Sequence, residues 1–391
     1  MRHLIIKHFG PLTEVEIELK RVTLLIGPQS SGKSTVLKIA CFCDWLERRI
    51  QMTQEPERYC NSSVINNNLI AFHRLEGFMK DNSYLSYESD TMSFSYDAKK
   101  RKFDFAWKKG GKRWAYKRAK IAYCPAERNL LASIPNWYQI SMENNNILSF
   151  MKEWEFARKS FTKKENIIGL PFDYKYNPED SSDLIVLPDG KELKLTNASS
   201  GLQSLTPLFV MIKYLTGGIF KKKYSNVEDA VLKDHLEQVV QEFFPSLERC
   251  RKVVNGIMEL HHTDMFIEEP EAHLFPSTQK EFVYVLADLL NGNSRRKHTC
   301  VIATHSPYLM TAFNNLIQAG ETASASGGNN QKVAERFPVK RRLRFDDVAA
   351  FSMKDGKAES IMDDDFKMIS AEDLDSASRE ISDDFNFLLE I

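Results

Sequence analysis

The sequence contains no apolar run long enough to cross a lipid bilayer. Its first ten residues, MRHLIIKHFG, hold a short apolar run that Lys7 and His8 interrupt, which is typical neither of a secretory signal nor of a membrane anchor. We therefore expect a cytoplasmic protein with no membrane partner.

Cysteine is also scarce, with six residues in a chain of 391. The six are scattered, and only Cys41 and Cys43 lie close together. A zinc site would need a second pair of cysteines or histidines at ligand spacing, whereas the segment KIACFCDWLERR has the pattern of a helix. We expect reduced thiols in the core of a cytosolic protein.

An excess of one charge is absent as well, because 53 lysines and arginines balance 53 aspartates and glutamates. The chain as a whole therefore has no electrostatic attraction for nucleic acid or for an anionic membrane, and any basic surface must be local. Internal repeats and sustained heptads are missing too, which excludes long coiled-coil arms.

What the sequence does contain is a phosphate-binding loop, in the stretch IGPQSSGKST from Ile26 to Thr35. An apolar strand ends at Ile26 and a helical pattern begins near Ser34, which is the context that this motif requires. Lys33 would reach the β- and γ-phosphates of a nucleotide, Ser34 would hold Mg²⁺, and the amino end of the helix would add its positive dipole. The predicted nucleotide contacts are Gly27, Pro28, Gln29, Ser30, Ser31, Gly32, Lys33, Ser34 and Thr35.

Two adjacent acids end another apolar strand, in the sequence DMFIEEPEAHLFP. A phosphate loop works with an acid that assists the metal at the end of a neighbouring buried strand, and in some classes with a carboxylate that orients the attacking water. Glu268 is the candidate metal-side acid and Glu269 the candidate base. The structural alternative is a helix start that favours acids at its positive end, and Pro270 fits that alternative as well.

A histidine follows a further buried strand, in the sequence VIATHSPYLM. Parallel strands place their carboxyl ends on one edge of a sheet, so His305 should share an edge with the phosphate loop, Glu268 and Glu269. A lone histidine is usually structural, but this placement favours a contact with the γ-phosphate.

Together these segments resemble the ABC-type ATPases of the SMC, RecF and OLD group. IKHFGPLTEVEIEL is similar to the strands that precede the loop in that group, IEEPEAHLFP to its extended Walker B motif and ATHSP to its switch histidine. ASSGLQS is similar to its signature motif, with Ser200 and Gly201 on the conserved serine and glycine and Gln203 at the end. By itself that segment would be only a capped helix start. The resemblance covers about residues 1 to 50 and 190 to 315.

The resemblance implies an α/β fold of the ABC-type P-loop NTPase class, with a mostly parallel sheet, an antiparallel β lobe and a small helical insert. It also implies ATP and Mg²⁺ as cofactors, ATP hydrolysis, and a homodimer or higher homo-oligomer that closes head to tail on two nucleotides. In each site Lys33, Ser34, Glu268, Glu269 and His305 would come from one chain. Ser200, Gly201 and Gln203 would come from the other.

A single ATPase domain over residues 1–391 is the expected organisation. Its predicted segments are the N-terminal strands and phosphate loop (1–50), an insert (51–83) with a helix near residues 70–79, an antiparallel lobe (84–129), a helical and loop insert (130–195), the signature, Walker B and switch-histidine region (196–318), a flexible loop (319–335), and C-terminal strands with an acidic helix (336–391). Within these segments the patterns predict helices at about 144–162, after 196–200, at 228–250, at about 277–290 and at about 371–389. They also predict a strand pair in DLIVLPDGKELKL and a turn at Asp355 and Gly356.

Departures from the group's pattern bear on activity. Gln29 stands where asparagine is usual and Glu268 where many members have aspartate, so the rate of hydrolysis stays open. No glutamine matches the group's Q-loop, and YCPAERN, which resembles a motif of OLD-like ATPases, occupies that junction. Glu127 and Arg128 are candidates for coupling the lobes or sensing the nucleotide, with a buried structural ion pair as the alternative.

The biological role depends on what accompanies this domain in the group. The residues between PAERN and SSGLQ are too few for SMC arms, and those after His305 are too few for the Toprim domain of OLD nucleases, so we expect no nuclease activity. Similar short ATPases belong to bacterial antiphage systems, where they hold or release an effector protein. A switch of this kind is the first interpretation, and a DNA-binding repair or recombination ATPase of the RecF type is the alternative.

That alternative depends on residues 99–120, where lysines and arginines are interleaved with five aromatic residues. Such a composition is typical of a nucleic-acid groove. Alternation would equally place the aromatic residues on the half-buried face of a hairpin that turns at residues 108–112. Contact with DNA or RNA is therefore possible on the sequence but not decided by it.

Overall fold

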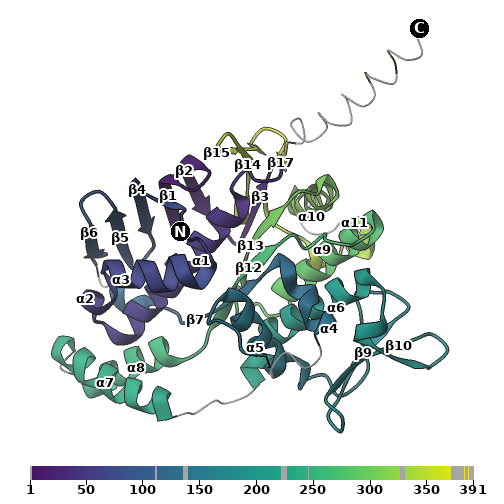
Figure 1. The fold of residues 1–391 in the computed structure, drawn as a ribbon, viewed down its shortest axis with the longest axis horizontal. Coiled ribbons are helices and arrows are strands. Elements are labelled where there is room, and N and C mark those ends of the chain that lie inside the picture. Colours follow the sequence, from purple (N-terminus) through teal and green to yellow (C-terminus); the bar gives the residue numbers. More distant parts are fainter. Residues whose placement is uncertain are drawn as a thin grey trace.

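A continuous sheet of 11 strands organises the computed structural model, in the order β6-β5-β4-β1-β2-β15-β14-β3-β13-β12-β7 (Figure 1). The structure describes residues 2–110, 112–134, 140–221, 227–244, 246–325 and 331–370, together with Asp383 and Asn386. The fold is α/β, and it joins a parallel half and an antiparallel half in one sheet.

The parallel half contains every strand that the phosphate-loop motif requires. Its strands pair in parallel from β14 to β7, and they are β14 (Val348–Lys354), β3 (Val22–Ile26), β13 (Thr299–Thr304), β12 (His262–Glu268) and β7 (Ala119–Cys124). Nearly every residue of β3, β12 and β13 is buried, because helices cover both faces of this half.

Alternate residues of these strands face two separate cores. Leu24 of β3 and Ile302 of β13 pack with the helices of one face, whereas Leu25 and Val301 pack with α1 on the other. The helices on the first face are α5 (Asn146–Arg158), α6 (Ser200–Thr216), α9 (Pro276–Leu290) and α10 (Pro307–Ala325); α1 spans Lys33–Thr53. The helices predicted after the phosphate loop, near residue 150, after Ser199 and after Pro276 are thus confirmed at the level of elements.

The antiparallel half extends the sheet from β2 and keeps one face toward α1. Its strands are β1 (Arg2–Phe9), β2 (Leu12–Leu19), β4 (Met79–Glu88), β5 (Met92–Asp97) and β6 (Lys102–Trp107). Val15, Ile17 and Leu19 are all buried on the α1 side, as their strict alternation predicts. The short β15 (Lys357–Ser360) joins this half to β14 after the turn predicted at Asp355 and Gly356.

The predicted hairpin around residues 108–112 is wrong. After β6 the chain makes a 3₁₀ turn, η2 (Lys112–Ala115), and residues 119–124 then form β7, which pairs in parallel with β12 instead of returning along β6. The antiparallel lobe therefore ends at β6, within the predicted segment 84–129. Alternation identifies a strand but not its neighbour, and here the buried end of β7, at Tyr123 and Cys124, belongs to the parallel half.

The insert at residues 51–83 also differs from the expectation of a helix near residues 70–79. The chain forms the short helices α2 (Pro56–Tyr59) and α3 (Ser62–Val64) and a π-helical segment, η1 (Ile65–Ala71), before β4 begins at Met79. Apolar Ile65 and Leu69 face the α1 core, so η1 stabilises the start of the antiparallel half.

Residues 126–134 and 140–221 cover the α6 side of the sheet together with α9 and α10. They form η3 (Ala126–Asn129), α4 (Leu130–Ser133), α5 and a small four-stranded sheet, followed by η5 (Leu195–Asn197), α6 and η6 (Gly218–Lys221). The small sheet contains β8 (Glu165–Asn166), β9 (Asp173–Asn177), β10 (Ser182–Val186) and β11 (Glu192–Lys194), and it includes the strand pair predicted from DLIVLPDGKELKL.

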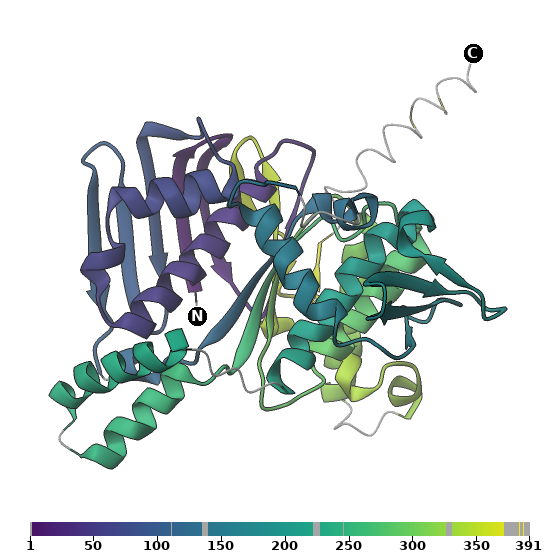
Figure 2. The same ribbon diagram turned by 60° about the horizontal axis from the view of Figure 1, so that its bottom comes forward.

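The helical stretch predicted at residues 228–250 is two helices, α7 (Val227–Phe243) and α8 (Leu247–Met258). They form a hairpin with its own small core around Leu236, Val240 and Val254, and Trp114 and Tyr116 pack against that core. Figure 1 shows this hairpin projecting from the body of the molecule below α1, and Figure 2 shows the same projection from another side.

The loop predicted at residues 319–335 is largely helical. α10 continues to Ala325 and α11 spans Gln331–Arg336, while residues 326–330 lie outside the described part. The small residues that indicated a loop instead permit close packing, because a Cβ at Gly320 would lie 2.0 Å from the Leu343 carbonyl oxygen. The rest of this region forms η7 (Val339–Arg341), η8 (Phe345–Asp347) and the pair β16 (Met362–Asp363) and β17 (Met368–Ile369). Of the acidic helix predicted at residues 371–389, the structure describes only Asp383 and Asn386, which are both helical.

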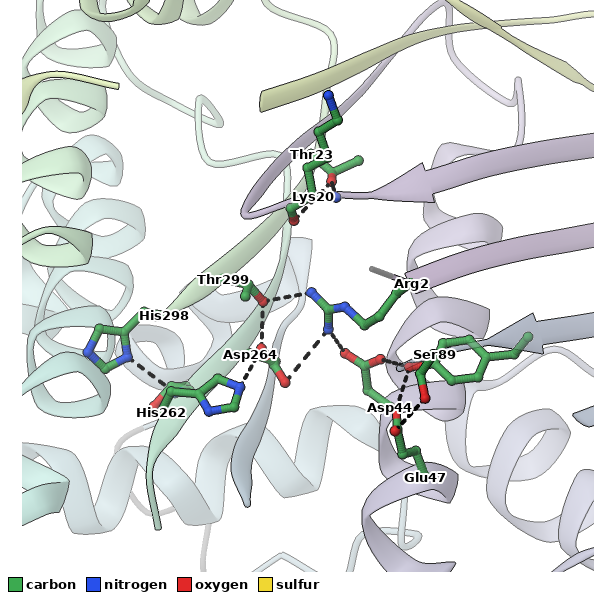
Figure 3. A network of polar contacts seen from close by, with 12 residues as sticks. Arg2, Lys20, Thr23, Asp44, Glu47, Ser89, His262, Asp264, His298 and Thr299 are labelled. Atoms are coloured by element: carbon green, nitrogen blue, oxygen red, sulfur yellow. Dashed lines mark hydrogen bonds and ion pairs between the residues drawn. The ribbon is translucent and has the colours of Figure 1, made fainter. Parts of the chain in front are cut away.

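A buried polar network joins the two halves at the amino ends of β12 and β13, opposite the phosphate loop (Figure 3). Arg2 of β1 pairs with Asp44 of α1 and, at 3.7 Å, with Asp264 of β12, and it donates to Thr299. Burial, opposed by Arg2 and reinforced by Asp264, raises the pKa of Asp44 to about 7. Burial also acts to raise the pKa of Asp264, but Arg2 and His262 outweigh it and keep that pKa below its usual range.

None of the described helices combines the length and the apolar character needed to cross a membrane.

Candidate nucleotide site

The phosphate loop connects β3 to α1 and requires glycine at two positions. Gly27 has φ 149° and Gly32 has φ 95°, values that other residues rarely adopt. A Cβ at Gly27 would lie 2.3 Å from the Met353 carbonyl oxygen of β14, and one at Gly32 would lie 2.3 Å from Leu12 Cδ2. The loop is therefore held between β14 and β2, with Pro28, Gln29 and Ser30 exposed at its tip.

Lys33 folds into the concave side of this loop. Its ammonium donates to the carbonyl oxygens of Gly27 at 2.9 Å and Pro28 at 2.7 Å, and to Ser31 Oγ at 3.3 Å. Burial lowers the pKa of Lys33 to about 8, although Glu269 and Glu271 oppose the shift. A nearby anion would restore the ordinary pKa, so the loop is electrostatically suited to phosphate.

Glu268 is the last residue of β12 and is buried. Its Oε1 accepts a hydrogen bond of 2.6 Å from the Tyr123 hydroxyl, and its Oε2 accepts one of 3.1 Å from the Ala126 amide. Both donors lie at or after the end of β7, so the orientation of this carboxylate is set by the neighbouring strand.

Glu269, His305 and Lys33 meet at the same edge of the sheet. His305 follows β13, and its Nε2 lies 3.6 Å from Glu269 Oε1 while its Nδ1 lies 3.4 Å from Lys33 Nζ. The Glu269 side chain is 41% exposed and that of His305 is 28% exposed, so solvent reaches both. The sequence-based expectation that these three residues share an edge is consistent with this geometry.

Glu271 is a residue of this edge that the sequence analysis missed. Its Oε1 accepts a hydrogen bond of 2.6 Å from the His305 amide, and its Oε2 is buried without a hydrogen-bond partner among the described residues. The third acid of EEPEAH was the available signal. Next to it, Ser306 donates to Gln279 of α9 at 2.5 Å, which fixes the turn between β13 and α10.

Arg128, in the PAER segment, is almost fully buried and contacts the turn after β12. It donates to the carbonyl oxygens of Glu268 at 2.9 Å and Glu269 at 2.7 Å. Glu127 points elsewhere and pairs with Arg74 at 3.1 Å on the surface. The alternative of a buried structural ion pair is therefore wrong, because among the described residues neither Glu127 nor Arg128 takes part in one.

The predicted signature segment begins α6. The Ser199 side chain caps the helix by accepting from the Leu202 amide at 3.5 Å, and Ser200 is exposed. Gln203 donates to the Thr196 carbonyl at 2.9 Å, so its amide group stabilises the preceding turn. Among the described residues, no hydrogen bond joins this segment to the phosphate loop of the same chain, and Gly201 lies instead beside His273, whose carbonyl oxygen would be 3.1 Å from an added Cβ.

The residues assigned to a metal are oxygen donors of the kind that Mg²⁺ prefers. The Ser34 hydroxyl follows Lys33 in the first turn of α1, and the Glu268 carboxylate uses only two of its roughly four acceptor positions. Among the described residues, no group of three or more His, Cys, Asp or Glu side chains could hold a metal alone. The donor set therefore fits an Mg²⁺ ion that takes its remaining ligands from phosphate and water.

The basic segment 99–120 does not form an exposed aromatic surface. Phe103 and Phe105 are half-buried on β6, and Arg113 stacks on Trp107 and Trp114 at 4.2 and 4.5 Å from their ring centres. Four of the lysines, Lys100, Lys102, Lys108 and Lys120, pair with carboxylates. Most of the aromatic side chains that suggested base stacking are thus used for packing.

One segment of the chain matches a known family of ATPase domains. Residues 261–310 match the family described as "AAA ATPase domain", a segment that contains Glu268, Glu269 and His305 but not the phosphate loop. The search among curated proteins found no match.

Solved structures align over most of the chain at low scores. The SMC head domain from Thermotoga maritima has a TM-score of 0.40 and 12% identity, and covers 92% of this chain and 98% of that one. The Smc head domain derived from Pyrococcus furiosus, bound to the C-terminal domain of ScpA, has a TM-score of 0.38 and 9% identity, and the alignment covers 98% of this chain and 100% of that one. The dimeric ATP-binding cassette MJ0796 bound to ADP and Pi has a TM-score of 0.31 and 11% identity, and the alignment covers 91% of this chain and 96% of that one. The α/β fold itself follows from the strand order and the phosphate loop of this chain.

Proposed function

We propose that this chain is an ATPase of the ABC type that closes as a dimer around ATP. The observation that carries the proposal is the convergence of Lys33, Glu269 and His305 at the carboxyl edge of β3, β12 and β13. Three contiguous strands thus present a cation, a carboxylate and an imidazole beside a loop built for phosphate. The match of residues 261–310 to an ATPase family supports the same conclusion.

The proposed reaction is the attack of water on the γ-phosphorus of ATP, with cleavage of the bond to the β–γ bridging oxygen. Glu269 would orient the water and accept its proton, since its carboxylate is accessible to solvent. Lys33 and His305 would stabilise charge on the phosphate oxygens. Ser34 and Glu268 would hold Mg²⁺, which supplies charge neutralisation when bound.

The second half of the site is proposed to come from another copy of the chain. At the amino end of α6, Ser200 is exposed and Gly201 is half-buried, and a helix end of this kind presents backbone amides that bind anions. Gln203 contributes to this end by holding the turn at Thr196. A head-to-tail homodimer would bring each α6 end onto the phosphate loop of the partner and create two equivalent sites.

The biological role that we propose is a cytoplasmic switch in bacterial antiphage defence, in which nucleotide-driven closure controls an effector protein. The resemblance of the motifs to short OLD-like ATPases supports this role. The alternative of a DNA-binding ATPase of the RecF type has less support from the structure, because the aromatic residues of segment 99–120 are engaged in packing. Salt-dependent DNA binding that is lost on neutralising Lys109 and Lys112 would favour that alternative.

The test is Glu269→Gln, which keeps the shape of the side chain but removes the base. We expect ATP hydrolysis to fall by about 100-fold or more, ATP binding to persist, and a dimer to accumulate with ATP in size analysis. Proteins that co-purify with this trapped dimer would identify the effector. Unchanged hydrolysis would contradict the role of Glu269, and a monomer at all ATP concentrations would contradict the composite site.

A further inference from the structure

Arg128 has an unusual environment for a charged side chain. It is 1% exposed, and among the described residues no carboxylate lies within ion-pair distance of its guanidinium. All its hydrogen bonds go to backbone carbonyl oxygens, on Pro125, Ser204, Glu268 and Glu269. A guanidinium has five donors in a planar fork, so it can bind several carbonyl groups in fixed directions at once.

Two of the acceptors, on Glu268 and Glu269, belong to the turn after β12 that carries the proposed base, here called the catalytic turn. Glu269 has φ 42°, a left-handed conformation that is uncommon for a residue other than glycine. Its amide donates to the Ala303 carbonyl of β13 at 2.8 Å, and its own carbonyl accepts from Arg128 at 2.7 Å. These two bonds hold the peptide groups on both sides of Glu269, and so they set the direction of its side chain toward His305.

A third acceptor belongs to the signature helix. Arg128 Nε donates at 3.2 Å to the carbonyl of Ser204, in the first turns of α6 and one turn beyond Ser200. The same guanidinium therefore touches the turn that carries the proposed base and the helix that carries the proposed signature. Because α6 is packed as a rigid element, a shift of its amino end would move the Ser204 carbonyl and strain the contacts of Arg128.

We infer that Arg128 is a positioning residue that couples the catalytic turn to the signature helix of its own chain, and thereby couples the two nucleotide sites of a dimer. The inference rests on the proposed function. In a head-to-tail dimer the Glu269 of one chain serves one site, whereas its Ser200 serves the other. When α6 closes onto the partner's nucleotide, the contacts of Arg128 change, and with them the position of Glu269 in the chain's own site. The two sites therefore act together.

Arg128→Lys tests the positioning role, because lysine keeps the charge but loses the planar fork. We expect kcat per folded molecule to fall by about 10- to 100-fold, while ATP affinity changes by less than about threefold, since the phosphate loop is untouched. Arg158→Lys is the matched control. Arg158 is also buried, and it joins α5 to Asp183 of β10, remote from the proposed catalytic residues.

If Arg128 only stabilises the fold, both variants should lose stability and neither should lose kcat per folded molecule. A value of kcat for Arg128→Lys within about twofold of the parent chain, at concentrations where both are folded, would overturn the positioning role.

Coupling between sites is tested in mixed dimers that contain one Arg128→Lys chain, isolated by two affinity tags. If Arg128 serves only its own Glu269, one site stays intact and about half of the activity remains. Coupling predicts activity well below half, together with a reduced Hill coefficient for ATP in the Arg128→Lys homodimer. Half activity with an unchanged Hill coefficient would overturn the inference. Failure of the unmodified chain to dimerise with ATP would instead contradict the proposed function.

Discussion

Lys33 illustrates how burial prepares a single residue for its ligand. With its pKa lowered to about 8, the ammonium is partly neutral in weakly alkaline solution, and the phosphates of ATP would favour its charged form. Nucleotide binding should therefore take up protons above about pH 8 and little at pH 7.

The measurement is titration calorimetry at pH 7.0 and 8.5 in buffers of different ionisation enthalpy. We expect an uptake of roughly half a proton per ATP near pH 8, and a nucleotide affinity that falls as the pH rises further. Proton uptake that is equal at both pH values would show that Lys33 does not meet the phosphates.

Arg2 has a structural role that is also a matter of charge at one residue. It is the cation shared by Asp44 and Asp264, and its removal leaves two buried carboxylates without a guanidinium (Figure 3). Arg2→Met should lower the free energy of unfolding by about 3 to 5 kcal/mol at pH 8.

The pH dependence of this loss has a definite sign. Asp44 has a folded pKa above its unfolded value, so its contribution to stability is present below about pH 4 and is lost as the pH rises through about 7. Without Arg2 the folded pKa would rise further, so the deficit of Arg2→Met should be larger at pH 8 than at pH 5. Urea unfolding at both pH values measures it, the double variant Arg2→Met/Asp44→Asn should recover part of it, and a pH-independent deficit would contradict the assignment.

At the scale of elements, the packing of α10 depends on a missing side chain. Gly320 lies against the Leu343 carbonyl, whereas Gly256 of α8 has nothing within 4 Å of its built Cβ. Gly320→Ala should therefore destabilise the protein by about 1 to 3 kcal/mol, because backbone must move to admit the methyl group. Gly256→Ala should be neutral or stabilise by up to about 1 kcal/mol, because alanine favours the helix.

Thermal or urea unfolding of these two variants separates local helix propensity from packing between elements. An equal effect of the two substitutions would mean that α10 does not pass as close to residues 337–347 as the structure shows.

At the scale of the whole molecule, the composite site predicts complementation between inactive chains. Lys33→Ala removes the phosphate-binding lysine, and Ser200→Arg places a bulky charge at the exposed end of α6. Each variant should be inactive alone. A mixed dimer would keep one intact site, so an equimolar mixture should recover about a quarter of the parent activity if the two sites are independent, and measurably less than a quarter if Arg128 couples them.

Steady-state ATP hydrolysis of the separate and mixed variants provides the measurement. Ser160→Arg, in the exposed turn that follows α5, is the matched control and should keep full activity alone. No recovery on mixing, with both variants folded and exchanging partners, would contradict a site shared between chains.

Local patterns predicted the elements around the nucleotide site well. The strands before the phosphate loop, before Glu268 and before His305 are apolar runs bounded by clear motifs, and each has the expected place in the parallel half. The edge that they share follows from the rule for parallel strands, so the meeting of Lys33, Glu269 and His305 could be anticipated.

Errors arose where a pattern fits two environments. Alternation in residues 103–124 predicted a hairpin, but β7 pairs with β12 while Trp114 and Tyr116 pack on α7 and α8. Small polar residues at 319–335 predicted a loop, but residues 319–325 belong to a helix that a neighbouring backbone approaches closely. The positions of Glu271 and Arg128 beside the site depend on hydrogen bonds between segments far apart in the sequence.

The sequence by itself determined the phosphate loop, the acids and histidine at the strand ends, and the alternation of the buried strands, because each depends on residues close together in the chain. Tertiary structure decided which strands are neighbours, where the basic aromatic segment packs and what Arg128 binds. Those outcomes depend on contacts between residues far apart in sequence, such as Arg128 with Glu269 and Arg2 with Asp264, which no local pattern encodes.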